Sequence, residues 1–200
     1  MKYTLYMKLR AVGLGQCSLD FILALPCYPK EDRKLEALDF ITQGGGPAAT
    51  ALVTLARLGV KTSFIGVVGN DFASSRIVNE LKEEGVDTRH LMRRKGSSQV
   101  AAILANPNKG TRTILWKRPS AKPLSAKEVD TKTIANSSIL LLDGLMKDAS
   151  IHAAKIARQY SIPVLLDSGR MRPGMKELIK LSTYVIGSEE FSKEDRKSVV

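Results

Sequence analysis

Residues 43–59 read QGGGPAATALVTLARLG, a run of three glycines followed by a proline and an apolar segment with helical spacing. Glycine allows positive φ and close approach of the backbone to other groups, and proline is favoured in the first turn of a helix. The stretch predicts a tight turn at residues 44–46, then a helix over residues 47–58 that Gly59 ends. The helical spacing turns five side chains toward the core: Ala48, Ala51, Leu52, Leu55 and Leu58.

The backbone amides at the start of this helix are a candidate binding feature. The first N–H groups of a helix have no partner within it, so they can bind hydroxyls or a negative group. The alternative is an ordinary tight turn between a strand and a helix, which explains one glycine better than three. We therefore expect another group to approach the backbone closely at Gly44, Gly45 and Gly46.

The rest of the chain alternates apolar runs with helical patterns. Strands are predicted over residues 11–15, 63–69, 138–143, 162–167 and 183–187, and helices over residues 73–84, 149–160 and 175–181. This alternation is typical of an α/β fold, a doubly wound and mainly parallel sheet with helices on both faces. No repeat or change of composition marks a linker, so residues 1–200 are interpreted as one domain.

Two segments break the alternation, residues 21–42 and residues 97–117. The first contains the strand patterns FILAL and EALDFIT, and the second contains QVAAILA and TRTILW, joined by the turn NPNKG. We interpret the two segments as a small second sheet, a lid that projects from the α/β body.

The composition suits a globular protein with its own core. Of the 200 residues, 44% are hydrophobic and 26% are charged, which allows a core without disulfides or metals. The formal charge of +11, from 31 Lys and Arg against 20 Asp and Glu, favours partners that carry phosphate. The basic residues are spread along the chain without an aromatic-rich basic tract, which argues against nucleic acid as the partner. A nucleic-acid-binding role would require steeply salt-dependent association.

The cysteines and the N-terminal stretch indicate the compartment. Cys17 and Cys27 are too few for a disulfide framework and lack metal-binding spacing. The opening MKYTLYMKLRAVGLG has no sustained apolar core before a cleavage site, and no apolar run reaches the ~18 residues that cross a membrane. We expect a reduced, cytoplasmic chain without a signal peptide or a membrane span.

Asp20 is the most informative single carboxylate in the sequence. It follows the first predicted strand, and open α/β sheets place ligand-binding groups where strands end. An ionised carboxylate can accept hydrogen bonds from two vicinal hydroxyls, which suits a polyol or a sugar. The alternative is an aspartate that caps backbone groups in a turn.

Four segments together resemble the N-terminal part of the ribokinase/PfkB family of carbohydrate kinases: AVGLGQCSLD, GGGPAATALVTLARLG, FIGVVGNDFAS and LKEEGVDTRHL. Their order and spacing are more specific than any one glycine motif, and the resemblance runs from Ala11 to Glu190. It implies a ribokinase-like doubly wound fold with a small β-sheet lid. It also implies transfer of the γ-phosphoryl of ATP to a hydroxyl of a sugar, sugar phosphate or nucleoside, usually with Mg²⁺.

The resemblance implies substrate-binding residues position by position. Asp20 resembles the family's acceptor of sugar hydroxyls, and Gly45 and Gly46 resemble its substrate-cradling diglycine. Asp143 falls near a position that often supplies a further polar contact to the sugar. Lys34, just before the predicted strand over residues 35–42, is a candidate for contact with an anionic substituent.

Three departures from the family pattern bear on the metal, on the identity of the sugar and on catalysis. Glu190 resembles the acidic end of an Asn-x-x-Glu motif associated with Mg²⁺ and phosphate, but Gly187 replaces its asparagine. Ala49 stands where many members have a sugar-contacting asparagine. Members also continue into a C-terminal Gly-Ala-Gly-Asp segment that supplies the general base and an anion hole, and nothing in this sequence matches it.

The leading hypothesis is an ATP-dependent carbohydrate kinase of which this chain is the sugar-binding and lid portion, without catalytic residues of its own and inactive alone. The alternative hypothesis is a non-catalytic module that binds sugar or assembles through its lid, as lids do in some family members. In either case a homodimer through the β lid is a candidate assembly.

Overall fold

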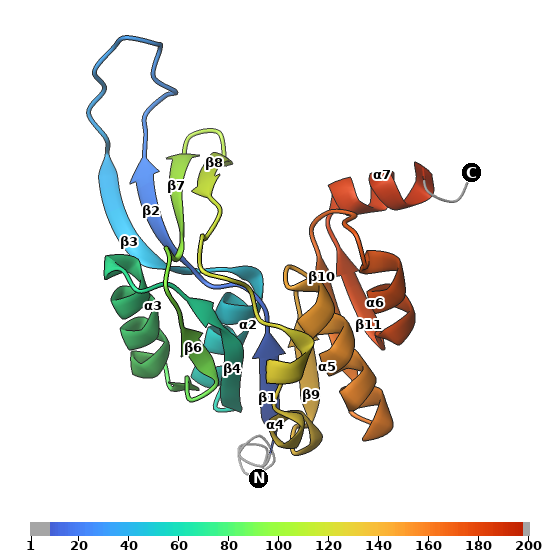
Figure 1. The fold of residues 1–200 in the computed structure, drawn as a ribbon. Coiled ribbons are helices and arrows are strands. Elements are labelled where there is room, and N and C mark those ends of the chain that lie inside the picture. The colour runs from blue at the N-terminus through green and yellow to red at the C-terminus, as the bar shows by residue number, and fades with distance from the viewer. Residues whose placement is uncertain (1–8, 198–200) are drawn as a thin grey trace.

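The computed structural model describes residues 9–197, with the backbone alone for residues 195–197. Its body is a seven-stranded sheet in the order β11-β10-β9-β1-β4-β5, with β6 also paired to β4, and every pairing is parallel. The strands are β1 (Arg10–Leu14), β4 (Lys61–Val68), β5 (Val86–Asp87), β6 (Leu91–Arg93), β9 (Ile139–Leu142), β10 (Val164–Ser168) and β11 (Tyr184–Gly187). Their carboxyl ends point toward the top of Figure 1. The predicted doubly wound α/β fold is confirmed.

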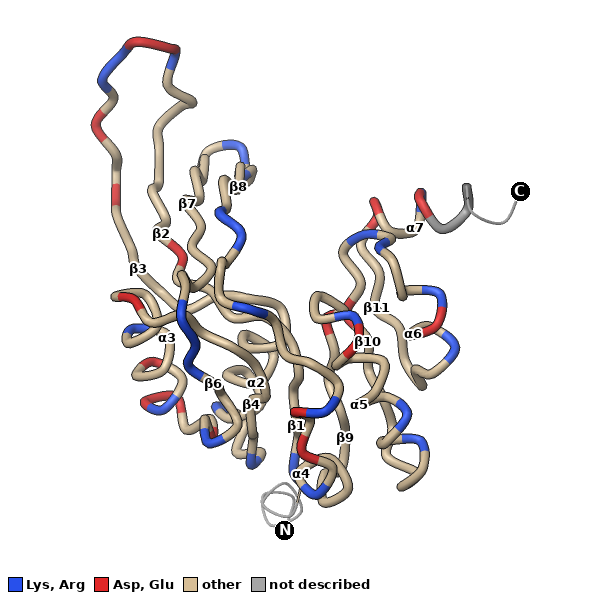
Figure 2. The backbone as a smooth tube through the Cα atoms, viewed as in Figure 1, with Lys and Arg blue, Asp and Glu red and all other residues tan. Residues whose placement is uncertain are grey.

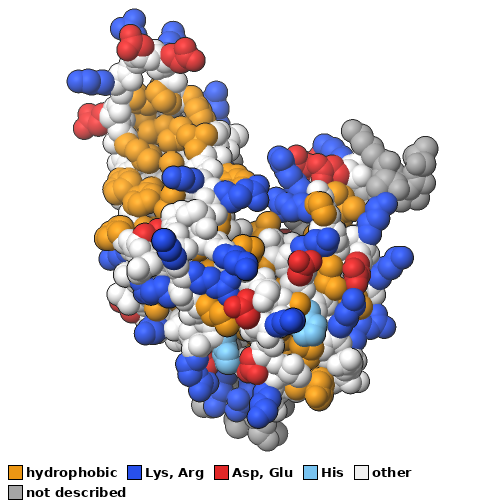
Figure 3. Space-filling model, in the orientation of Figure 1, with side chains coloured by type: hydrophobic (Ala, Val, Ile, Leu, Met, Phe, Trp, Pro, Cys, Tyr) orange, Lys and Arg blue, Asp and Glu red, His pale blue; other side chains and the backbone are white. Residues whose placement is uncertain are grey.

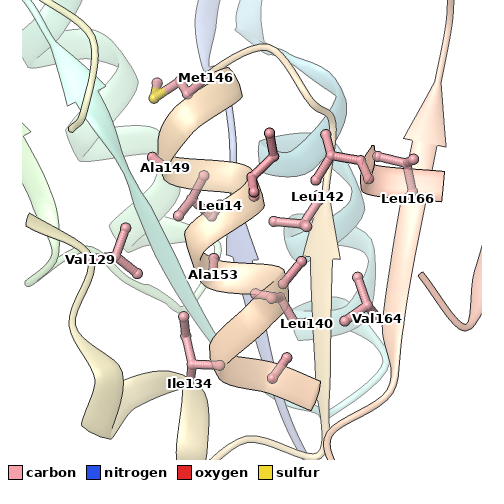
Figure 4. Packing of buried hydrophobic residues seen from close by; sticks show 14 of the residues in the cluster. Leu14, Val129, Ile134, Leu140, Leu142, Met146, Ala149, Ala153, Val164 and Leu166 are labelled. Carbon is pink, nitrogen blue, oxygen red and sulfur yellow. The ribbon is translucent and has the colours of Figure 1, made fainter. Parts of the chain in front are cut away.

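Helices cover both faces of this sheet because its central strands are apolar on both sides. On β9, Leu140 and Leu142 belong to one apolar cluster, whereas Leu141 belongs to the other. The first cluster lies under η1 (Ala126–Glu128), α4 (Thr131–Ala135), α5 (Lys147–Gln159) and α6 (Met175–Leu181). The second lies under α2 (Pro47–Arg57) and α3 (Phe72–Glu83). Figure 4 shows Ala149 and Ala153 of α5 facing the strands, where small side chains let the helix approach closely.

The lid is a separate four-stranded sheet in the order β3-β2-β7-β8. It consists of β2 (Ser18–Ala24), β3 (Asp39–Gly45), β7 (Gln99–Asn106) and β8 (Thr111–Lys117). The outer pairings are antiparallel and the central pairing, β2 with β7, is parallel. Figure 1 shows the lid projecting above the carboxyl ends of the body strands. The two predicted strand pairs therefore form one sheet, as expected.

Side chains alternate between the two faces of the lid. One register row contains Gln43, Asp20, Ala101 and Trp116, which share a face, and the next row on that face consists of four isoleucines. We call this the Asp20 face. The opposite face carries Phe21 and Phe40, whose stacked ring centroids are 6.4 Å apart.

Helix α2 follows the sequence prediction at its ends but not along its whole face. Pro47 is its first residue, and Gly59 follows the C-cap with φ 85°, as expected of a C′ glycine. Leu58 was predicted to face the core but is 67% exposed, because it lies past the last helical residue, where the chain has already turned. Ala49, which the prediction omitted, is buried.

Other differences from prediction lie in short or polar elements. Strands β5 and β6 and helix α4 are too short for a clear period, and α7 (Glu189–Lys197) is almost entirely polar. Along β11, every residue is exposed, including Tyr184, Val185 and Ile186. Within residues 9–197, no helix is long and apolar enough to cross a membrane.

Candidate functional site

Asp20 lies on lid strand β2, close to where the lid joins the body. Its Oδ1 atom accepts a 2.7 Å hydrogen bond from the hydroxyl of Ser18. Burial raises the pKa of this half-buried carboxyl group, and the bond from Ser18 opposes the shift. Within residues 9–194, whose side chains the structure describes, no donor is bonded to its other oxygen, Oδ2. That oxygen can therefore accept a hydrogen bond from a ligand hydroxyl.

The position of Asp20 corrects the prediction that it follows the first strand of the body. Strand β1 ends at Leu14, and the chain crosses to the lid before β2 begins at Ser18. The lid strand therefore starts three residues earlier than predicted. The physical reason is that Ser18 pairs with Gly45 on one side and with Gln99 on the other, which extends the lid sheet down to the glycine run.

The three glycines have three different neighbours. The amide of Gly44 donates to both carboxylate oxygens of Glu80 on α3, at 2.7 Å each. A Cβ atom on Gly45 would lie 2.6 Å from the carboxyl carbon of Asp20. Gly46 has φ 100°, and a Cβ atom there would lie 2.8 Å from Cα of Cys17. The amides therefore do not form one outward-facing group, because Gly44 and Gly45 end strand β3 and only Gly46 caps α2.

Asp143 lies just after β9, where it is buried and fully engaged with backbone groups. Its Oδ2 accepts a 2.7 Å bond from the amide of Gln16, and its Oδ1 a 3.0 Å bond from the amide of Leu145. Burial raises its pKa to about 6, against the effect of these bonds and of a bond from the amide of Ala48. Asp143 thus joins the β1–β2 connection, the β9–α5 loop and the start of α2.

Cys17 lies beside this carboxylate and is not a candidate nucleophile. Its side chain is buried, and burial together with the charge of Asp143 raises its pKa to about 12. The thiol is therefore protonated at neutral pH, whereas nucleophilic cysteines require the thiolate.

Lys34 and Glu190 lie apart from Asp20. Lys34 is exposed in the loop between β2 and β3, which forms the charged tip of the lid in Figure 2. Glu190 lies in the first turn of α7 and is paired with Arg170, with 2.8 Å between Nη2 and Oε1 and 3.0 Å between Nε and Oε2. A Cβ atom on Gly187 would lie 2.6 Å from Phe191, so this ring occupies the space that a larger residue would need.

Ser18 and Gln99 belong to the surroundings of Asp20, although motif reasoning did not select them. They stand opposite each other in the row next to Asp20 on the Asp20 face. The side-chain oxygen of Gln99 is buried and has no hydrogen-bond partner among the described side chains and backbone. A period-2 pattern carried across the lid strands was the signal that could have found them.

A cavity of about 220 Å³ lies beside this region, between β8 with the segment that follows it, strand β4, and the loops after β1, β9 and β10. Gln16 follows β1 and Leu145 follows β9, and both line it. The strand order reverses here, because β1 has β4 on one side and β9 on the other. Open α/β sheets bind ligands at the carboxyl edge where the order reverses. We call this cavity the switch-point pocket.

Comparison with known families agrees with this geometry. The model of the pfkB family carbohydrate kinases matches residues 9–191. The chain belongs to the pfkB family of carbohydrate kinases.

Curated relatives of this pfkB-family chain are sugar kinases. It is 25% identical over 178 residues to ribokinase of Bacillus subtilis, an alignment that covers 88% of this chain and 61% of that protein. It is 30% identical over 161 residues to 5-dehydro-2-deoxygluconokinase of Clostridium tetani, covering 76% of this chain and 45% of the relative. The chain thus spans between about half and three fifths of the length of these relatives.

Solved structures show the same fold. Ribokinase of Arabidopsis thaliana, determined in complex with ribose and ATP, superposes on the pfkB-family chain with a TM-score of 0.75 at 22% identity. The superposition covers 94% of this chain and 68% of the ribokinase. The shared fold includes both the parallel body and the lid.

Proposed function

We propose that the protein is an ATP-dependent carbohydrate kinase that transfers the γ-phosphoryl of ATP to a hydroxyl of a sugar or related polyol, and that this chain supplies its sugar-binding site and lid. The observation that carries the proposal is the carboxylate of Asp20, which lies on lid strand β2 and whose Oδ2 accepts no hydrogen bond from residues 9–194. Family membership and relatives named as ribokinase and 5-dehydro-2-deoxygluconokinase support the same reaction class. The free cysteines are consistent with a cytoplasmic protein.

In this proposal Asp20 accepts hydrogen bonds from hydroxyls of the sugar. Gly45 leaves room for the carboxylate, and Ser18 fixes its orientation through Oδ1. The unpartnered oxygen of Gln99 lies in the adjacent row and would accept a hydrogen bond from a further hydroxyl. ATP would be the phosphoryl donor, as the ATP-bound ribokinase of Arabidopsis thaliana suggests.

Mg²⁺ usually accompanies phosphoryl transfer, but the described residues fit it poorly. Glu190 is the candidate ligand, and Arg170 engages both of its carboxylate oxygens. Residues 9–194 contain no group of three or more acidic, histidine or cysteine side chains that could hold a metal. We therefore assign no step of the reaction to a metal held by this chain alone.

The test is a comparison of binding and turnover. ATP consumption is measured over a panel of hexoses, pentoses, nucleosides and their phosphates, with the 200-residue chain and with the protein encoded by the complete reading frame. Binding of the same panel is measured by calorimetry. We expect sugar binding by both proteins and turnover only by the longer one, because phosphoryl transfer depends on positioning and on electrostatic stabilisation from groups that this chain does not show.

An Asp20→Asn variant makes this test specific to the site. It keeps the volume of the side chain and removes the charge, so the affinity for an accepted sugar should fall about tenfold or more. The proposal fails if the longer protein phosphorylates none of the panel and Asp20→Asn changes the affinity for no ligand.

A second candidate function, assembly through the lid, is favoured by one observation. Apolar side chains are exposed on the lid: Phe40 is 58% exposed and Leu115 58%, both on the face opposite Asp20. Figure 3 shows the apolar patch over the lid strands below the charged tip. Light scattering of the wild type and of a Phe40→Asp, Leu115→Asp variant tests it, since a monomeric wild type excludes a lid-mediated dimer.

A further inference from the structure

Two arginine side chains line the switch-point pocket and reach it from separate parts of the chain. Arg118 follows β8, and its guanidinium carbon lies 5.3 Å from the centroid of the Trp116 ring. Arg172 lies in the loop between β10 and α6. Within residues 9–194, neither guanidinium is within ion-pair distance of a carboxylate. Figure 3 shows Lys and Arg side chains on both sides of the hollow between the lid and the part of the body that carries α6 and α7.

Among the described side chains, neither arginine is in direct contact with a carboxylate, although two carboxylates lie near the same edge of the sheet. Asp143 accepts bonds from the amides of Gln16, Leu145 and Ala48. Asp167, near the end of β10, is close enough to Asp143 to raise its pKa, and within residues 9–194 it forms no ion pair with either arginine. Glu190 is paired with Arg170. Helix α5 begins directly after the pocket residue Met146 with no side-chain cap, which adds partial positive charge at the same edge.

One register row of the lid sheet runs from the proposed sugar site to the pocket. Trp116 stands in the same row as Asp20, two strands across the lid and on the same face. Neighbouring strands lie about 4.8 Å apart, so the two positions are separated by roughly 10 Å. A sugar that is held by Asp20 and extends toward β8 would present its far end to the pocket that the two arginines line.

We propose that the phosphoryl acceptor of this kinase carries an anionic group, a carboxylate or a phosphate ester, that binds between Arg118 and Arg172 in the switch-point pocket. This inference rests on the proposed function and narrows its substrate class to sugar acids and sugar phosphates. Guanidinium groups match both anions, because their N–H donors form two parallel bonds to a carboxylate or a phosphate. The stacking of Arg118 on Trp116 holds one donor group in place before the ligand arrives.

The experiment compares matched ligands that differ in charge. Calorimetry on the full-length protein measures D-ribose against D-ribose 5-phosphate, D-glucose against D-gluconate, and the non-hydrolysable ATP analogue AMP-PNP. The variants are the double substitution Arg118→Gln, Arg172→Gln and the single Arg172→Lys. The control is Lys61→Gln, which removes a cation from the amino-terminal edge of the sheet, at the start of β4.

We expect an anionic ligand to bind the wild type more tightly than its neutral counterpart, and the double variant to lose about tenfold or more of that affinity alone. The affinity of Arg172→Lys for the anionic ligand should lie between those of the wild type and the double variant, because an ammonium group cannot form the paired bonds. Lys61→Gln should change nothing. Comparison of the gluconate pair with the ribose 5-phosphate pair identifies whether the pocket binds a carboxylate or a phosphate.

Three results would overturn the inference. The first is that no anionic sugar binds the wild type. The second is that the double variant binds the anionic sugars as tightly as the wild type does. The third is that the double variant loses affinity for AMP-PNP alone, which would assign the arginines to the nucleotide. The proposed function is tested separately by Asp20→Asn, which should weaken the neutral and the anionic member of a pair alike. If sugars bind through Asp20 and an anionic sugar binds no more tightly than its neutral counterpart, the kinase proposal stands and the proposal of an anion-binding pocket is rejected.

Discussion

Gly45 lacks a side chain because the carboxylate of Asp20 occupies the adjoining space. A methyl group on Gly45 would lie 2.6 Å from the carboxyl carbon, so the carboxylate would have to move away from Ser18. We expect Gly45→Ala to lower the affinity for an accepted sugar about tenfold or more and to reduce the free energy of unfolding by about 1–3 kcal/mol. Calorimetry and urea denaturation measure the two effects.

Gly59 provides the control for this substitution. It has φ 85°, and an added methyl group would meet no atom within 4 Å, so the cost of Gly59→Ala is confined to the backbone. Its free energy of unfolding should fall by about 1 kcal/mol while sugar affinity stays unchanged. Wild-type affinity in Gly45→Ala would contradict the assignment of Asp20.

Asp143 gives the stability of the protein a dependence on pH of known sign. Its pKa is raised to about 6 in the folded protein from an ordinary value of 3.8. A raised pKa means that the folded state binds the proton more tightly, so this stabilisation is complete below pH 4 and is lost as the pH rises through 6. We expect the difference in unfolding free energy between Asp143→Asn and the wild type to change between pH 4 and pH 6.

Urea denaturation at several pH values measures this difference. The comparison with Asp143→Asn is needed because Asp87 and Glu128, each with a pKa lowered to about 2, titrate with the opposite sign. Their stabilisation is lost as the pH falls, and it cancels between the two proteins. If the difference in unfolding free energy between Asp143→Asn and the wild type stays constant from pH 4 to pH 6, burial does not raise the pKa of Asp143.

At the scale of elements, Asp71 connects helix α3 to lid strand β7. Its Oδ1 accepts bonds from the amide of Ser74 at 2.9 Å and from the hydroxyl of Ser98 at 2.8 Å, and its Oδ2 accepts the amide of Ser98 at 2.8 Å. Asp71→Ala should cost about 2 kcal/mol, because it removes the helix cap and leaves the Ser98 groups unpaired. Hydrogen exchange should accelerate at the start of β7.

Asp130 offers a matched comparison, because it caps α4 without contacting the lid. Its carboxylate accepts the amides of Lys132 and Thr133. Asp130→Ala should therefore reduce stability by about 1 kcal/mol and leave exchange in β7 unchanged. Equal exchange in β7 for the two variants would show that Asp71 does not anchor the lid.

Long apolar elements were predictable from the sequence, whereas short elements, and ends that depend on pairing with distant strands, were not. The strands before α2, α3, α5 and α6 and the helices themselves were placed within a few residues, because their apolar periods extend over whole elements. The start of β2 at Ser18 was missed because it depends on pairing with Gly45 and Gln99, which are distant in sequence. Leu58 was misassigned because the predicted helix ran one residue too far: α2 ends at Arg57, and Leu58 is its exposed C-cap.

The candidate site was predictable only in part, for the same physical reason. Asp20 and the glycine run were selected by residue type, and the structure brings Asp20 and Gly45 together. The separate neighbours of Gly44 and Gly46, and the three backbone bonds that occupy Asp143, depend on tertiary contacts that no local pattern encodes. The two arginines of the switch-point pocket are 54 positions apart by number, as 172 minus 118, and only the fold unites them.

At the scale of the whole molecule, the body sheet has an exposed edge at β11. Tyr184, Val185 and Ile186 are 57%, 39% and 58% exposed, and the strand has a partner on one side only among residues 9–197. Exposed apolar edges pair readily with other chains. We expect the 200-residue chain to self-associate with rising concentration, and Ile186→Lys to reduce this association in light scattering.

Phe72→Lys is the control for the edge. Phe72 is 73% exposed, but it lies on α3 and offers no unpaired strand groups. If the two substitutions reduce self-association equally, the association arises from nonspecific contact between apolar surfaces and not from strand pairing at β11.

Because Asp20 is carried by β2, the carboxylate that we propose as the sugar-binding group moves whenever the lid moves. The apparent dissociation constant for sugar is then the intrinsic constant divided by the fraction of molecules whose lid is in place. A change at the lid anchor that halves this fraction doubles the apparent constant, although no atom that touches the ligand has changed. If Asp20 binds the sugar as proposed, sugar affinity reports the population of one lid arrangement as well as the chemistry of one carboxylate.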